Sequence, residues 1–556
     1  MRRLAGVAAA IFVAALAAHQ AFAMTNTKAA SDRIVVKAPA GALRGTLEGD
    51  LRVFRGIPFA EPPIGAKRWR APVPKAPWKG VRDARTFGPA CPQPAGKLNN
   101  IYANEPWPRS EDCLTLNIWA PEHARKAPVL FWIYGGALWS GTSRDPLYDG
   151  TRLAKRGVIV VSINYRTGIL GWLAHPDLSA ENAQGLSGNY GLLDQIEALR
   201  WVRRNIGAFG GDPANVTIAG ESAGGLSVMY LMASRPARGL FKRAIAQSAY
   251  MISTPSLKSP SHGALSAEAS GAALAQKLNV PTLGALRAMD GQALTDAAAA
   301  AGFGPFGAVD GKILSGQLVD VFDKGEQAPV PILAGFNEGE IRSLGILAPP
   351  APASAAQYER LIRERYGDLA DAFLRVYPSA DYRESILATT RDALYGWTAE
   401  RLVRKQSELG HHSYLYLWDH GYPVADSAGL HAFHGSELPY MFGTFGGTPP
   451  LWPKITDGAG ERALSDAMID YWTSFARDGT PRASGAPVWP AFGAAHAYLH
   501  FREHPVPATG MMSGMYELNE AVVCRRRAAG TIAWNWNVGL ASPALPPPAP
   551  GCPSPR

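Results

Sequence analysis

The 556 residues are 47% apolar, 10% aromatic and 18% charged, a composition that excludes a disordered, collagen-like or low-complexity chain. The 55 Lys and Arg residues outnumber the 46 Asp and Glu residues, which gives a formal net charge of +9. The basic residues are scattered apart from Arg525-Arg526-Arg527, so we expect a solvated surface and no nucleic-acid partner.

The first 23 residues follow the pattern of a secretory signal peptide. Arg2 and Arg3 precede an apolar run at 4–18, and Ala-Phe-Ala at 21–23 supplies the small residues of a cleavage site. Cleavage after Ala23 would remove two Arg and no acidic residue, leaving +7. The alternative is an uncleaved membrane anchor, although the run is short for a span. We therefore expect a soluble exported protein, secreted or periplasmic, with no membrane span after cleavage.

The chain holds four cysteines, Cys91, Cys113, Cys524 and Cys552. An even number in an exported chain favours disulfides over free thiols. Three pairings are possible, and nearness in sequence favours Cys91–Cys113 and Cys524–Cys552. Metal ligation is the alternative, but neither pair has the C-x-x-C spacing of a zinc site.

Short apolar runs alternate with helical patterns through the first half of the chain. Residues 128–134, 158–164 and 216–219 predict strands buried on both faces, and residues 192–206 carry apolar side chains at helical spacing. Strands separated by helices predict an α/β fold, with a large, mostly parallel sheet covered on both faces.

The candidate catalytic residues are spread from 222 to 434, so we expect one catalytic domain over residues 24–540. Residues 255–270 and 347–356 look irregular and are expected to be surface insertions. Residues 541–556 form a Pro-rich tail, which we expect to be disordered apart from the part that Cys552 holds.

Residues 220–224, Gly-Glu-Ser-Ala-Gly, fit the pattern G-x-S-x-G. A predicted strand leads into this segment and a helical pattern follows it, so Ser222 would occupy a sharp turn with its hydroxyl exposed. Glycines are needed because a Cβ would collide across the turn. The N–H of Ala223 would lie at the helix N-terminus, where it favours a developing oxyanion. The alternative interpretation is a glycine-rich helix start capped by a serine.

A second glycine-rich segment, Gly135-Gly136-Ala137, follows the predicted strand at 128–134. Small residues at the end of a buried strand let backbone N–H groups approach a ligand. An ordinary Gly-Gly turn is the alternative.

A histidine and an acid are needed to complete a serine hydrolase site. His434 lies in a Gly-containing segment, and Glu338 and Glu340 both follow the apolar run at 330–334. Either glutamate could instead be a solvated loop carboxylate. His431, His434 and Glu437 could alternatively bind a metal, but no further ligand set is apparent. No metal or cofactor is therefore predicted. The G-x-G-x-x-G match at 302–307 does not indicate dinucleotide binding, because it contains a proline and leads into no helix.

With these segments in order, the chain resembles the type-B carboxylesterases, the α/β-hydrolases that include cholinesterases and bacterial para-nitrobenzyl esterases. The resemblance covers nearly all of the chain after residue 23. It rests on five segments in the right order: residues 54–60 (FRGIPFA), 110–117 (SEDCLTLN), 209–225, 244–248 and the segment around His434.

The resemblance implies a carboxylic-ester hydrolase with Ser222 as nucleophile, His434 as general base and Glu340 as acid. Glu340 is preferred because the family's glutamate falls five residues after the position of Gly335. The N–H groups of Gly136, Ala137 and Ala223 would form the oxyanion hole. The resemblance also implies the Cys91–Cys113 disulfide and a supporting role for Ser248, which would help to hold the acid. Glu221, beside the nucleophile, is a further candidate for a supporting role.

Two departures bear on the substrate. Ala137 stands where the family has a third glycine, and Ala103 stands where cholinesterases have a choline-binding tryptophan, with Trp107 as the nearest substitute. Cholinesterase specificity is therefore not expected. A small-molecule ester is the expected substrate, and amides, carbamates or bulky aromatic esters of the feruloyl or tannin type remain alternatives. A non-catalytic binding protein is a remote alternative, because all three triad residues are present. Candidate pocket residues are Leu138, Trp139, Tyr250, Met251 and Met441.

Overall fold

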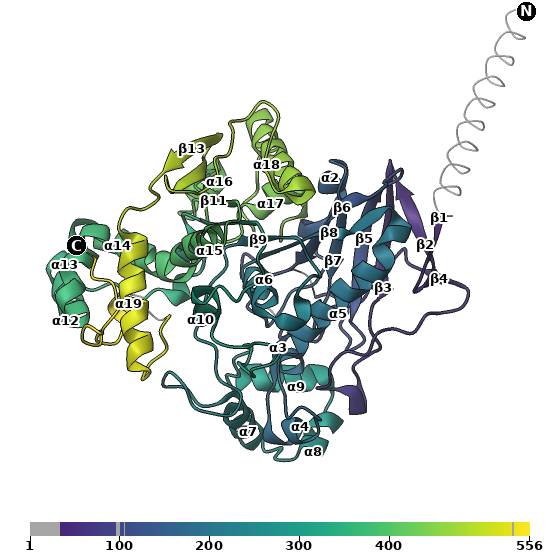
Figure 1. The fold of residues 1–556 in the computed structure, drawn as a ribbon, viewed down its shortest axis with the longest axis horizontal. Helices are drawn as coiled ribbons and strands as arrows, with labels where there is room; N and C mark the ends of the chain where they lie inside the picture. Colours follow the sequence, from purple (N-terminus) through teal and green to yellow (C-terminus); the bar gives the residue numbers. More distant parts are fainter. Residues whose placement is uncertain (1–33, 96–99, 105, 536–538, 556) are drawn as a thin grey trace, which may run out of the picture.

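The computed structural model describes residues 34–95, 100–104, 106–535 and 539–555 (Figure 1). The predicted signal peptide, residues 1–23, lies outside the described residues. A 13-stranded sheet runs through the molecule in the order β1-β2-β3-β5-β7-β6-β8-β9-β10-β11-β12-β13, and β4 pairs with β2.

The strands have the following bounds: β1 Ile34–Ala38, β2 Gly41–Glu48, β3 Leu51–Pro58, β4 Val81–Asp83, β5 Thr115–Pro121, β6 Ala127–Ile133, β7 Ile159–Ile163, β8 Gly211–Glu221, β9 Arg243–Gln247, β10 Ile332–Asn337, β11 Ser413–Trp418, β12 Ala497–Phe501 and β13 Pro505–Thr509.

The centre of the sheet, from β7 through β6, β8, β9, β10 and β11 to β12, is parallel. Most strands toward the two edges pair in antiparallel fashion, as β3 does with β5 and β12 with β13, whereas β4 pairs in parallel with β2. The predicted parallel sheet is confirmed, and the three predicted strands correspond to β6, β7 and β8. Because parallel strands end at one edge of a sheet, the segments after β6, β8, β10 and β11 meet there.

Both faces of the sheet are covered, which explains the continuous apolar runs. In β6, Val129, Phe131 and Ile133 enter the core on one face, and Leu130 and Trp132 enter the core on the other. The first core includes side chains of α5 (Tyr190–Asn205), α6 (Ala223–Ala233) and α15 (Trp397–Glu408). The second includes side chains of α17 (Leu438–Phe442) and α18 (Ala459–Asp478). The predicted helix at 192–206 is α5.

Two smaller helical groups lie at the periphery (Figure 1). One small core joins α3, α4, α7, α8 and α9, and another joins α12, α13, α14 and α19. The predicted irregular stretches, 255–270 and 347–356, end within the first turns of α7 and α12. The remaining helices are α2 Thr151–Ala154, α3 Gly168–Trp172, α4 Pro176–Ala180, α7 Ala267–Lys277, α8 Leu283–Ala288, α9 Gly291–Ala300, α10 Leu318–Asp323, α11 Glu340–Ser343, α12 Ala355–Tyr366, α13 Ala370–Val376, α14 Tyr382–Arg391, α16 Pro423–Ser427 and α19 Met515–Ala529.

Both predicted disulfides are present, Cys91–Cys113 and Cys524–Cys552. The second ties α19 to the C-terminal tail. The prediction of a disordered tail is wrong at its beginning, because Ser542 is fully buried and its carbonyl accepts a 2.7 Å hydrogen bond from Arg365. A Pro-rich composition gave no sign of these contacts with α12.

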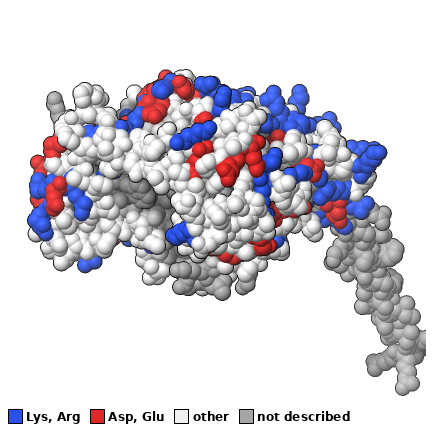
Figure 2. All heavy atoms as spheres, turned by 90° about the horizontal axis from the view of Figure 1, so that it is seen from below, with Lys and Arg blue, Asp and Glu red and all other residues white. Residues whose placement is uncertain are grey.

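Charged side chains of both signs are intermixed on the face in Figure 2, and much of its centre is uncharged. The single basic run of the sequence is neutralised locally. Arg525 pairs with Asp368 at 2.6 Å, Arg527 pairs with Asp323 at 2.9 Å, and Arg526 is buried. This run therefore forms no basic patch. Within the described ranges, no helix combines the length and the apolar character that a membrane crossing requires.

Candidate active site

Ser222 lies at the sharp turn between β8 and α6. Its φ of 55° and ψ of −121° are backbone angles that a residue with a side chain rarely adopts. A Cβ at Gly220 would lie 2.5 Å from the backbone of Gly224, and a Cβ at Gly224 would lie 2.0 Å from the carbonyl oxygen of Ile133. The turn therefore requires both glycines, as the motif predicted.

The segment after β6 passes directly beside Ser222. A Cβ added to Gly135 would lie 3.0 Å from the Cβ of Ser222, and Gly136 has a φ of 105° that favours glycine. Gly136 and Ala137 are exposed, and no hydrogen bond among the described residues uses their N–H groups. The N–H of Ala223, the first residue of α6, has no acceptor within the helix. These three amides are available to an oxygen atom beside Ser222.

His434 and Glu340 form a buried pair across the sheet edge from Ser222. Glu340 begins α11 just after β10 and is fully buried, and its Oε2 contacts Nδ1 of His434. The N–H of Asn337 donates to the other carboxylate oxygen at 2.9 Å. The N–H of Gly339 donates to the carbonyl of Ala432 at 2.9 Å, which joins the two segments that carry the pair.

Of the two candidate acids, the structure brings Glu340 to the imidazole. The carboxylate of Glu338 points elsewhere and pairs with Arg391 at 2.8 Å. Residues two apart share a face only within a strand. Because β10 ends at Asn337 and α11 begins at Glu340, the carboxylates of Glu338 and Glu340 point in different directions.

The structure does not join Ser222 to His434 by a hydrogen bond. Nε2 of His434 lies 3.2 Å from Oε1 of Glu221, and no hydrogen bond among the described residues connects the imidazole with Oγ of Ser222. Glu221 is 4% exposed and precedes Ser222 in the motif. Its carboxylate therefore faces the same ring nitrogen that a serine nucleophile would need.

Three buried carboxyl groups set the electrostatics around the imidazole. Burial lowers the pKa of His434, but the charges of Glu221 and Glu340 outweigh burial and raise that pKa above the ordinary value for histidine. Burial raises the pKa of Glu221 and of Glu437, because their charged forms lose water. The surroundings therefore stabilise the cationic imidazolium, the form that a general base becomes when it accepts a proton.

Two amide side chains that sequence reasoning missed hold Glu437 in place. Nδ2 of Asn337 donates to Oε2 of Glu437 at 2.6 Å and to the carbonyl of Phe433 at 2.8 Å. Nε2 of Gln247 donates to Oε1 of Glu437 at 3.0 Å. Neither amide falls in a recognisable motif. Their only signal is that both lie at the carboxyl ends of strands, Gln247 in β9 and Asn337 in β10.

Ser248 does not hold the acid in the way predicted. It is fully buried, but its Oγ has no hydrogen-bond partner among the described residues. The backbone N–H of Asn337 takes that place. The backbone N–H of Ser248 donates to the carbonyl of Gly335 at 2.8 Å, so Ser248 continues the β9–β10 pairing.

The candidate pocket residues fall into two groups. Leu138, Met251 and Met441 are buried in the two main cores. Trp139 and Tyr250 are partly exposed, and the ring of Tyr250 lies 6.1 Å from that of Tyr395, which in turn lies 5.3 Å from the ring of His434.

Trp107, the nearest tryptophan in sequence to Ala103, stacks against a charged side chain. The ring of Trp107 lies under the guanidinium of Arg144 at 5.1 Å. Tyr102, next to Ala103, faces the site instead, with its ring 6.4 Å from that of His434.

The predicted metal alternative is not assembled. His431 lies apart from His434 and Glu437, with Nε2 3.0 Å from Asp419 and Nδ1 2.7 Å from Asp426. Ligand atoms of Glu338, Asp419 and His431 lie within 4.8 Å of one another. Each of them is already paired with a group of opposite charge, so this cluster needs no cation to balance it.

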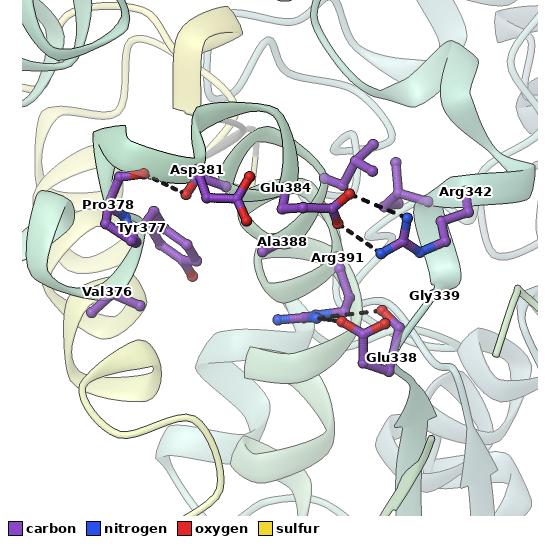
Figure 3. Close-up of a pocket in the computed structure, with 13 residues that line it drawn as sticks. Glu338, Gly339, Arg342, Val376, Tyr377, Pro378, Asp381, Glu384, Ala388 and Arg391 are labelled. Carbon is purple, nitrogen blue, oxygen red and sulfur yellow. Dashed lines mark hydrogen bonds and ion pairs between the residues drawn. The ribbon is translucent and has the colours of Figure 1, made fainter. Parts of the chain in front are cut away.

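A hollow of about 210 Å³ lies beside α11 (Figure 3). Gly339 and Ile341, the neighbours of Glu340, line it, and the pairs Arg342–Glu384 and Arg391–Glu338 form part of its walls. Ser222 and His434 do not line this hollow, so it is separate from the site built around them.

Comparison with known proteins covers nearly the whole chain. Residues 32–519 match the family model described as "Carboxylesterase family". A fumonisin B1 esterase of Sphingopyxis macrogoltabida is 37% identical over 83% of this chain and 85% of its own length. A para-nitrobenzyl esterase of Bacillus subtilis is 35% identical over 82% of this chain and 92% of its own length. A solved PNB esterase structure is similar with a TM-score of 0.76 at 31% identity, covering 88% of this chain and 99% of that one.

Proposed function

Because this chain belongs to the carboxylesterase family and has the α/β-hydrolase fold, we propose that Ser222, His434 and Glu340 carry out its hydrolysis of carboxylic esters. The observation that carries this assignment is the meeting of three strand ends. Ser222 follows β8 in a strained turn, the available amides follow β6, and the buried Glu340–His434 pair follows β10.

Acyl transfer then proceeds in two steps. His434 accepts the proton of Ser222 as Oγ attacks the ester carbonyl, and it then gives that proton to the departing alcohol. Water attacks the acyl-enzyme with His434 again as base, which releases the acid and restores Ser222. Catalytic hydrogen bonds often form only with substrate bound, so the bond between Ser222 and His434 belongs to that state.

The remaining groups stabilise charge. Glu340 orients the imidazole and stabilises the imidazolium, and the N–H groups of Gly136, Ala137 and Ala223 bind the oxyanion. Loss of one such donor typically costs about 3 kcal/mol of transition-state stabilisation.

Hydrolysis of para-nitrophenyl esters from acetate to laurate tests the assignment. Wild type should hydrolyse the short esters, and Ser222→Ala should be at least about 10⁴-fold slower. Ser234→Ala is a matched control, since Ser234 is a buried serine at the other end of α6 and has an unbonded hydroxyl. Activity that survives in Ser222→Ala would contradict the mechanism.

The substrate is proposed to be a small-molecule carboxylic ester. Two similar proteins are named for para-nitrobenzyl esters and fumonisin B1, so both compounds belong in the substrate panel. The aromatic row of Tyr250 and Tyr395 beside His434 favours acyl or alcohol groups with apolar surface.

Export is also proposed, to the periplasm or the medium. The pattern of residues 1–23 and the two disulfides support it. The exported protein should begin at Met24, and a chain that keeps residue 1 and stays in the cytoplasm would contradict export.

A further inference from the structure

We infer that Tyr102 is a positioning residue for His434, an inference that rests on the function proposed above. Tyr102 lies between the two cysteines of the Cys91–Cys113 disulfide, far from the triad in sequence. Its hydroxyl donates a 2.9 Å hydrogen bond to the carbonyl oxygen of His434, which is 332 residues away. Among the described residues, no other hydrogen bond reaches that carbonyl.

The same hydroxyl also reaches the helix that carries the acid. Tyr102 Oη lies 2.6 Å from Oγ of Ser343, the last residue of α11, and Glu340 is the first residue of that helix. Since the single phenolic hydrogen goes to His434, the hydroxyl of Ser343 donates to Tyr102 at 2.6 Å in preference to the carbonyl of Glu340 at 3.5 Å. The phenolic oxygen of Tyr102 therefore bridges α11 and the backbone of His434. This bridge fixes the spacing between the side chains of His434 and Glu340, which contact each other through Nδ1 and Oε2.

The ring of Tyr102 is held so that this bridge has a defined place. It meets Trp452 edge to face at 5.7 Å, and Trp452 in turn packs on Phe433 at 4.8 Å. Trp452 is 3% exposed, so the aromatic support is rigid. Burial raises the pKa of Tyr102 well above its usual range, so the hydroxyl keeps its hydrogen at working pH.

Loss of the bridge should act on turnover rather than on binding. The hydroxyl contacts the backbone of His434 and not a reacting atom, so its removal lets the imidazole drift relative to Ser222. A misplacement of about 1 Å can cost about 100-fold in rate. For Tyr102→Phe, which keeps the ring and its packing, we expect kcat to fall about tenfold with KM changed less than about twofold.

The experiment compares Tyr102→Phe with Tyr358→Phe on para-nitrophenyl acetate, with active sites titrated by a fluorophosphonate so that kcat is counted per active enzyme. Tyr358 is equally suited to this exchange, because it is buried in α12 and donates a 3.3 Å bond to the carbonyl of Tyr377, away from the site. Equal kcat values in the two variants would overturn the inference, as would a loss confined to the melting temperature.

Ser343→Ala gives a second test that leaves the tyrosine in place. It should lower kcat by about two- to threefold, and the double variant with Tyr102→Phe should match Tyr102→Phe alone, because both act through one oxygen. Additive losses, or an unchanged kcat in Ser343→Ala, would contradict the bridge. His434→Ala separates this inference from the proposed function: activity in His434→Ala would overturn the function itself, whereas an inactive His434→Ala beside a fully active Tyr102→Phe would overturn only the role of Tyr102.

Discussion

Glu221 occupies the variable position of the G-x-S-x-G motif, yet its carboxylate lies 3.2 Å from Nε2 of His434. A charge at this distance acts on the base itself. The imidazolium is stabilised, and the base becomes available only at higher pH. We therefore expect the residue between glycine and serine to influence the pH range in which His434 can act as a base.

Glu221→Gln should move the acid limb of kcat/KM to lower pH by about one unit, because removal of the carboxylate removes a charge that raises the pKa of His434. Glu338→Gln is the matched control. Its carboxylate pairs with Arg391 and not with the imidazole, so the acid limb should stay in place. A limb that moves upward in Glu221→Gln, or equally in both variants, would contradict this account.

Sequence reasoning could place Ser222 and its flanking glycines in a sharp turn because the turn geometry dictates residue type. His434 was inferred from its Gly-containing segment and from the resemblance to a known family. The choice between Glu338 and Glu340 needed the resemblance to a known family. Tyr102 and Asn337 gave no signal in the sequence. Tyr102 bonds to His434, which is 332 positions away, and Asn337 bonds to Glu437, which is 100 positions away. Contacts between residues so far apart in the sequence are set by the fold and not by a local sequence pattern.

At the scale of elements, the junction of β8 and α6 is tightly constrained. Gly224→Ala places a Cβ 2.0 Å from the carbonyl oxygen of Ile133, a backbone atom that cannot move aside. We expect about 3 kcal/mol of destabilisation in urea unfolding, whereas Gly207→Ala, with open space around it, should stay within about 0.5 kcal/mol. Equal stability of the two variants would refute the close packing of this turn.

The Cys91–Cys113 loop is the element that brings Tyr102 to the site. Replacement of both cysteines by alanine should lower the free energy of unfolding by about 3 kcal/mol and also lower kcat. The Cys524–Cys552 pair, which ties α19 to the tail, should give a similar loss of stability with kcat unchanged. Stopped-flow kinetics on the folded enzymes measures kcat for both double variants. An equal fall in kcat in the two variants would contradict this account.

Strand identity was predictable, but strand length was not. The apolar run at 216–219 lies within the continuously buried part of β8, residues 216–221. The strand itself extends back to Gly211, where Ala127 in β6 pairs with it. Backbone pairing continues where side chains become exposed, and hydrophobic pattern cannot detect it.

At the scale of the whole molecule, His431 should make stability depend on pH. Its hydrogen bonds to Asp419 and Asp426 raise its pKa from 6.5 to about 9, so the folded protein holds an extra proton between these values. The free energy of unfolding should therefore fall as pH rises from about 6.5 to about 9. The effect should be modest, because the side chain is partly exposed.

His431→Gln should flatten this slope, and His123→Gln, at an exposed position, should keep it. Urea midpoints measured from pH 6 to pH 9.5 would decide the matter. A slope of the wild-type size in His431→Gln would contradict the assignment of the proton to His431.

The parallel centre of the sheet followed from the apolar runs, whereas the antiparallel edges and the order of the strands did not. A single catalytic domain over residues 24–540 stays a prediction. The docked tail at Ser542 was missed because proline content reports the lack of regular structure, and it does not report the lack of contacts.

The central claim is that Ser222 becomes acylated with the help of His434. Rapid acid quench of a slow para-nitrophenyl ester reaction, followed by mass spectrometry of peptides, tests it directly. The acyl mass should appear on the peptide that contains Ser222, and it should be absent from Ser222→Ala and at least about 100-fold slower to form in His434→Ala. An acyl group on another residue, or equal labelling of His434→Ala, would contradict the claim.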